Sequence, residues 1–163
     1  MKEQFLMQGR YQRLMNQHFY EACTQLKTDD LLADRSAFFK SIIGTLNHML
    51  LTDRIWLASF QGQKEEYDSL DQILYADFAE LRLAREATDQ AISEWLDGVS
   101  EEELAAGFHD RLKFPLWVAV THFFNHQTHH RGQVSQMLSE AGVDYGATDM
   151  PFLPGVVDWS ASA

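Results

Sequence analysis

The sequence predicts an all-α protein folded as a single four-helix bundle, and three observations support this. Strand patterns are nearly absent, because no extended run alternates apolar and polar side chains. The segment from Met1 to Phe114 contains no proline, the residue that interrupts helices most strongly. Apolar residues recur at helical spacing in four long segments. A chain of 163 residues is long enough for one domain with its own core and too short for two of ordinary size.

The first two helices are expected at about residues 3–27 and 35–61. The first has one apolar stripe. The second carries apolar residues on more than one side, which indicates burial on several faces. Phe38 and Phe39, near its beginning, are expected to belong to the core.

The third and fourth helices are expected at about residues 70–97 and 115–141. The third has a single apolar stripe backed by charged residues, and Gly98 marks its end. The fourth begins at Pro115, because proline is favoured in the first turn, and it ends before Gly142.

The connector at residues 98–114 is expected to hold one short helix, because Ser100 and Glu103 have the spacing of a capping box. The tail, residues 142–163, contains glycines and prolines and should be irregular. Its apolar residues predict packing against the bundle or against a second subunit.

The composition excludes several classes of function. A formal net charge of −11 argues against nucleic-acid binding and, more weakly, against anionic membranes. No run reaches the length of about 18 apolar residues that a membrane span needs, and the N-terminus lacks the pattern of a secretion signal. Cys23 is the only cysteine, so no intrachain disulfide and no Cys-x-x-Cys pair can form. We therefore expect a cytoplasmic protein.

Two histidines on the fourth helix have the spacing of metal ligands. His126 and His130 are four residues apart, so they lie on the same helix face and can point at one ion. His122 and His126 have the same spacing, but the apolar stripe places His126 and His130 nearer the core. We therefore predict that His122 and His129 lie toward solvent.

A third ligand is expected from another helix, because two imidazoles alone hold an ion weakly. His48 is the candidate, since small and polar neighbours on its face leave space beside the ring. Taken alone, a buried histidine is more often a hydrogen-bonded core residue. His18 stays open as a fourth ligand, and Gln133 as either a buried amide or a substrate contact. The residues expected to hydrogen-bond to the ligand imidazoles and orient them are Asn47, Asp53, Asn125 and Arg131, with Arg131 paired to Asp53.

Two segments, Thr45–Trp56 and Asn125–Gln133, together resemble the DinB/YfiT-like family of damage-inducible metalloenzymes, which are unrelated to the DNA polymerase of similar name. The resemblance covers nearly the whole chain, and the His-Arg-Gly-Gln block at residues 130–133 is its most specific part. It implies an up-down-down-up bundle, a nickel or zinc ion held by His48, His126 and His130, and a homodimer.

Three neutral imidazoles leave one coordination position open, which is the arrangement of catalytic sites. An ion there lowers the pKa of a water toward about 7 and deprotonates a thiol.

The resemblance implies thiol-dependent transferases, isomerases or hydrolases. The predicted function is therefore a metal-dependent enzyme that acts on a small molecule, using a low-molecular-weight thiol or water. The alternative is a non-catalytic bundle in which the metal is structural or sensory. No His-Glu-x-x-His motif occurs, which argues against a metalloprotease of that type.

Overall fold

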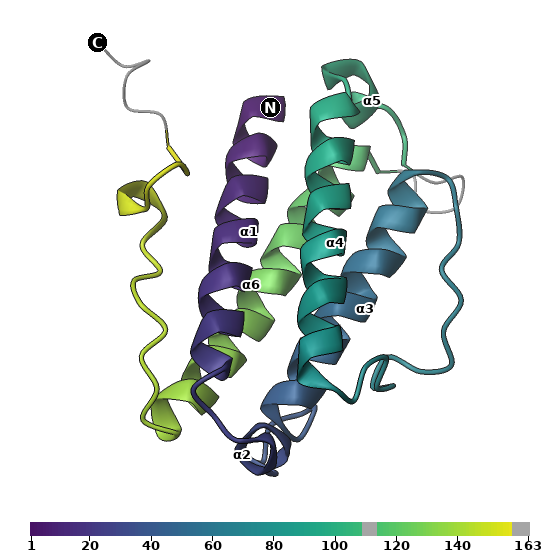
Figure 1. Ribbon diagram of the computed structural model, residues 1–163. Helices are drawn as coiled ribbons and strands as arrows, with labels where there is room; N and C mark the ends of the chain where they lie inside the picture. The colour runs from purple at the N-terminus through teal and green to yellow at the C-terminus, as the bar shows by residue number, and fades with distance from the viewer. Residues whose placement is uncertain (109–113, 158–163) are drawn as a thin grey trace.

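Four long helices lie side by side in the computed structural model, which describes residues 1–108 and 114–157 (Figure 1). Predictions for connector residues 109–113 and tail residues 158–163 lie outside the described residues. The described residues contain helices and no strand, so the predicted all-α fold is confirmed. The long helices are α1 (Lys2–Cys23), α3 (Ile42–Phe60), α4 (Phe78–Gly98) and α6 (Leu116–Glu140). The short ones are α2 (Thr28–Leu32), α5 (Glu101–Ala105) and the 3-10 turn η1 (Met150–Phe152).

The long helices form a closed ring in which α1 and α3 each contact both α4 and α6. Figure 1 shows α1 and α6 running in one direction and α3 and α4 in the other. This is the up-down-down-up order that the resemblance implies. Because α3 and α4 are parallel, the connector at residues 61–77 must return along the length of the bundle, and it covers one side of α3.

The second long helix, α3, begins later than the sequence pattern predicts. Its N-cap is Ser41, whose side chain accepts a hydrogen bond from the backbone N–H of Gly44 at 3.1 Å. A tight turn precedes it, in which Ser36 and Lys40 have φ angles of 56° and 68°. This turn puts the Phe38 side chain into solvent, at 81% exposed, where a core position was expected.

The third long helix, α4, also begins later than predicted, at Phe78. Asp77 caps it by accepting a hydrogen bond from the backbone N–H of Glu80 at 2.9 Å. The preceding residues 70–77 belong to the connector, which Asn47 ties to α3. The Asn47 side chain accepts from the backbone N–H of Tyr75 at 2.9 Å and donates to its carbonyl at 3.0 Å.

The first predicted helix is divided in two, because α1 ends at Cys23 and α2 follows as a separate short helix. The short helix α5 has the capping box that its sequence indicates, formed by Ser100 and Glu103. The tail contacts α1 through a hydrogen bond from the Tyr11 hydroxyl to the Thr148 carbonyl at 2.9 Å. Leu153 in the tail is buried.

The bundle has two apolar clusters separated by a polar layer. On α4 and α6 the buried polar residues fall between the residues of the two clusters. Arg85 lies at the centre of this layer, 2.7 Å from Asp53 and 2.9 Å from Asp89. The residues that complete the layer are Gln12 and Asn16 on α1 and Gln127 on α6. Such a hydrogen-bonded layer fixes the register of four helices that apolar contacts alone would allow to slide.

Within the stretches 1–108 and 114–157, no helix combines the length and the apolar character that crossing a bilayer requires.

Candidate metal centre

Three imidazoles from two adjacent helices converge at one point. α3 carries His48, and α6 carries His126 and His130. The Nε2 atom of His126 lies 3.4 Å from Nε2 of His48 and 3.1 Å from Nε2 of His130. One ring nitrogen from each of the three lies within 4.8 Å of the others. The structure therefore brings together all three residues that the sequence nominates.

Two of the three separations between these nitrogen atoms match those around a metal ion. A zinc–nitrogen bond is about 2.0–2.1 Å long, and a tetrahedral angle then places two ligand nitrogens about 3.3 Å apart. The two shortest separations, 3.4 Å and 3.1 Å, lie on either side of this value. The cluster thus fits a divalent metal site.

Hydrogen bonds at the opposite ring nitrogens select the tautomer that ligation requires. Nδ1 of His48 lies 2.8 Å from the Leu70 carbonyl oxygen, and Nδ1 of His130 lies 2.7 Å from Oε1 of Gln133. Because both oxygens can only accept, each Nδ1 carries the hydrogen and each Nε2 keeps its lone pair. Such partners orient a ligand ring and raise its basicity toward a metal.

The imidazoles are held in their neutral form. Burial, followed by the neighbouring rings of His130 and His48, lowers the pKa of His126 to about 3. Burial also lowers the pKa of His48 and of His130. At neutral pH all three rings are therefore unprotonated and ready to bind a cation.

Phe39 forms a wall of the site. Its ring stacks on His48, with ring centroids 3.8 Å apart and an angle of 18° between the planes. It also meets the edge of His130, at 5.5 Å. The turn before Ser41 places this ring, and the stacking restricts the rotation of the His48 side chain.

The expected supporting residues do not contact the imidazoles through hydrogen bonds in the part of the chain that the structure describes. Asn47 supports the site indirectly. Its side chain hydrogen-bonds to Tyr75, which belongs to the same connector as Leu70, and the Leu70 carbonyl contacts His48. Asn125 is exposed and lines a cleft on another side of α6.

Asp53 and Arg131 do not form the ion pair that the sequence suggested, because Asp53 pairs with Arg85 on α4. Arg131 instead donates to the Thr128 hydroxyl at 3.1 Å and lies over the Tyr11 ring. Sequence reasoning did not consider Arg85, because its charge gave no sign that the side chain would be buried.

The other histidines of the described residues do not join the ligand set. His18 lies beside the tail near Gly146. His122 meets the edge of Trp56 at 5.2 Å, and the ring of His129 lies against His130 at 4.8 Å. Within the described residues, no fourth His, Cys, Asp or Glu joins the three ligand candidates.

Sequence reasoning missed two of the groups that support the histidines and left a third undecided. The Leu70 contact is made by a backbone carbonyl, and because every residue has one, the sequence does not indicate which carbonyl will contact His48. Phe39 was expected in the core, but nothing indicated that it would face His48. Gln133 did carry a signal, because it follows His130 by three residues and so lies on a neighbouring part of the same helix face.

Comparisons with known proteins agree with this architecture. The family model described as "DinB family" matches residues 1–157. The uncharacterized protein YizA of Bacillus subtilis (strain 168) is 21% identical over 132 residues, which cover 77% of this chain and 80% of YizA. The crystal structure of a DinB-like protein from Bacillus cereus ATCC 10987 superposes with a TM-score of 0.60 at 20% identity. The superposition covers 82% of this chain and 89% of that one, and it shows a shared fold.

Proposed function

The chain belongs to the DinB family, and on this premise we propose that it is a metal-dependent enzyme acting on a small molecule. His48, His126 and His130 would hold one divalent ion, with nickel and zinc the best candidates because imidazole nitrogen suits both. The convergence of three neutral rings, with two tautomers already set, is the observation that carries the proposal.

The ligand set leaves room for chemistry. Three neutral donors do not reduce the charge of the ion, and no fourth His, Cys, Asp or Glu of the described residues joins them. When bound, such an ion lowers the pKa of a water or a thiol enough for deprotonation near neutral pH. We propose transfer of a low-molecular-weight thiol as the first reaction to test and hydrolysis as the second.

The chain's own residues would position the reaction. Leu70 and Gln133 hold the rings of His48 and His130, while Phe39 closes the side where these two rings meet. His126 is the most exposed of the three ligands, so a substrate would approach on its side. His122 and Trp56 lie along this approach and present an imidazole and an indole face.

The decisive experiment combines loading with metal and an activity screen. The full chain is loaded with Ni²⁺ or Zn²⁺ and assayed with cellular thiols and electrophilic acceptors, and separately with ester and amide substrates. We expect turnover that the His126→Ala variant loses. If the loaded protein melts at a higher temperature but turns over no substrate, a structural or sensory metal, our second hypothesis, takes its place.

We also propose that the protein is a cytoplasmic homodimer. Phe152 on the tail is 83% exposed and Phe38 is 81% exposed, and a second subunit would remove such apolar side chains from water. Analytical ultracentrifugation of the full chain tests the assembly, and a monomer at micromolar concentration would contradict it.

A further inference from the structure

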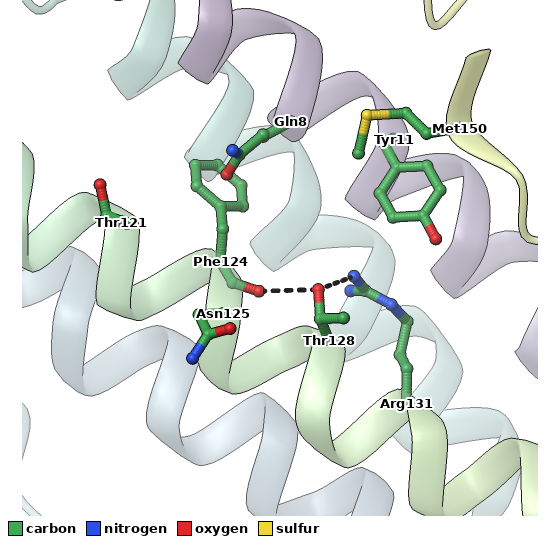
Figure 2. A pocket seen from close by; sticks show the side chains of 8 residues that line it. All are labelled: Gln8, Tyr11, Thr121, Phe124, Asn125, Thr128, Arg131 and Met150. Atoms are coloured by element: carbon green, nitrogen blue, oxygen red, sulfur yellow. Dashed lines mark hydrogen bonds between the residues drawn. The ribbon is translucent and has the colours of Figure 1, made fainter.

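The cleft between α1, α6 and the C-terminal tail is lined by a buried guanidinium, that of Arg131, whose hydrogen-bond donors are only partly satisfied (Figure 2). We propose that this cleft is a second binding site, separate from the histidine cluster, and that it binds a small organic carboxylate through the Arg131 guanidinium. The proposal does not depend on metal binding or on the proposed reaction.

The cleft lies on the other side of α6 from the histidines. It has a volume of about 220 Å³. Thr128 in its wall is two residues from both His126 and His130, which places it about 160° around the helix from each. A ligand in the cleft and an ion at the histidines would therefore bind on different faces of one helix. The lining residues are Gln8, Tyr11, Thr121, Phe124, Asn125, Thr128, Arg131 and Met150.

The Arg131 guanidinium is only partly satisfied by the protein. The residue is 5% exposed, and its Nη2 donates to the Thr128 hydroxyl at 3.1 Å. Its Nη1 is buried and has no hydrogen-bond partner among the described residues. A buried charge whose donors are only partly hydrogen-bonded is costly, so an acceptor that a ligand brings to the guanidinium would be favoured.

The nearby buried carboxylate does not serve as that acceptor. Asp53 accepts from Arg85 at 2.7 Å, from Gln12 at 3.0 Å and from Gln127 at 2.5 Å. Among residues 1–108 and 114–157, no acidic side chain lies within ion-pair distance of Arg131. The positive charge at the cleft is therefore free to attract an anion.

The walls of the cleft suit an organic acid. Figure 2 shows the Arg131 guanidinium beside Thr128 and close to the Tyr11 ring, with Met150 next to Tyr11. Tyr11 and Met150 offer apolar surface to the body of a ligand. The amide groups of Gln8 and Asn125 make no hydrogen bond within the described chain and can contact its polar substituents.

A carboxylate fits better than a phosphate. Among the residues that line the cleft, Nη1 of Arg131 is the one buried donor without a hydrogen-bond partner, and the Thr128 hydroxyl already donates to the Phe124 carbonyl at 3.0 Å. A phosphate dianion needs more donors and would be repelled more strongly by a chain of net charge −11. The chemistry of the site thus points to a monoanion with an apolar body.

The test uses the metal-free full chain, so that the probe cannot bind an ion at the histidines. Sodium benzoate is titrated against sodium chloride of equal ionic strength and followed by ¹H–¹⁵N NMR. We expect saturable shifts at the Arg131 guanidinium and at the backbone of Thr128 and Asn125. Arg131→Met should abolish saturation, while His126→Ala should bind benzoate as the parent chain does.

A second variant keeps the test decisive if Arg131→Met does not fold. Asn125 is exposed, so Asn125→Asp adds a negative charge to the cleft without disturbing the core, and it should weaken benzoate binding at least about tenfold. Gln17→Glu is the matched control, because residue 17 is exposed and lies about 180° around α1 from Gln8. It should bind benzoate like the parent chain.

Three results would overturn the proposal. The first is the absence of saturable binding to the parent chain. The second is benzoate binding that Asn125→Asp, or a folded Arg131→Met variant, leaves unchanged. The third is inorganic phosphate bound as tightly as benzoate, which would contradict the assignment to a carboxylate.

Discussion

The side-chain oxygen of Gln133 lies 2.7 Å from Nδ1 of His130, one helical turn away along α6. This contact fixes the ring of a ligand candidate from behind, and it is independent of whether the opposite nitrogen binds an ion. A substitution at Gln133 can therefore test the support of the His130 ring without removing a metal ligand.

Replacing Gln133 with leucine should weaken metal binding while leaving the fold intact. Losing the hydrogen bond that orients a ligand histidine costs about 10–100-fold in metal affinity. Gln133 is half-buried, so leucine can be accommodated. Competition with a chromophoric chelator measures the affinity for Zn²⁺. Gln136→Leu, at an exposed position on the same helix, is the control, and equal affinities of the two variants would contradict the role of Gln133.

The stability of the metal-free protein should fall as the pH is lowered below about 6.5. Burial holds the pKa of His126 at about 3, whereas in the unfolded chain the pKa is near the ordinary value of 6.5. Between these values the unfolded chain binds the proton and the folded one does not. The stabilisation is thus complete above the unfolded pKa and is lost as the pH falls toward 3.

Urea unfolding at pH 7.5, 6.0 and 5.0 measures this dependence. Each proton of difference contributes at most about 1.4 kcal/mol per pH unit, so His126→Gln should flatten the curve noticeably. A variant whose stability depends on pH as steeply as that of the parent chain would show that His126 is not the group responsible.

Arg85→Met should destabilise the fold by about 3–5 kcal/mol, because it leaves the carboxylates of Asp53 and Asp89 buried without their cation. Arg82→Met, three residues earlier on α4, removes an arginine that pairs with exposed Glu21 and Glu86 and should cost at most about 1 kcal/mol. Chemical denaturation of both variants gives the comparison. Similar losses would mean that the polar layer does not stabilise the bundle.

The sequence predicted best those features that depend only on the periodicity of a helix. The spacing of His126 and His130 and the apolar stripe beside them were enough to predict which pair faces His48. Helix beginnings were less predictable, since α3 starts only at Ile42 after a turn that depends on backbone angles at Ser36 and Lys40.

Contacts between distant segments were the least predictable. The pairing of Asp53 with Arg85 joins α3 to α4, and the Leu70 carbonyl reaches His48 from the connector. Neither contact follows a local period, because each depends on how the parallel helices α3 and α4 and their long connector are placed in space.

Gly44 fixes the turn that positions Phe39 over His48. A Cβ atom at residue 44 would lie 2.1 Å from the Phe39 carbonyl oxygen, so Gly44→Ala must displace that backbone. We expect a loss of about 1–3 kcal/mol in stability, as for other overpacked sites. We also expect weaker Zn²⁺ binding, because Phe39 would no longer hold the His48 ring.

Gly132→Ala provides the opposite case on α6. A Cβ there meets no atom within 4 Å, and alanine favours a helix interior by about 0.5–1 kcal/mol over glycine. Thermal unfolding should therefore show a higher melting temperature for this variant and a lower one for Gly44→Ala. If Gly44→Ala were as stable as the parent chain and bound Zn²⁺ equally well, the turn before α3 would have no part in shaping the histidine cluster.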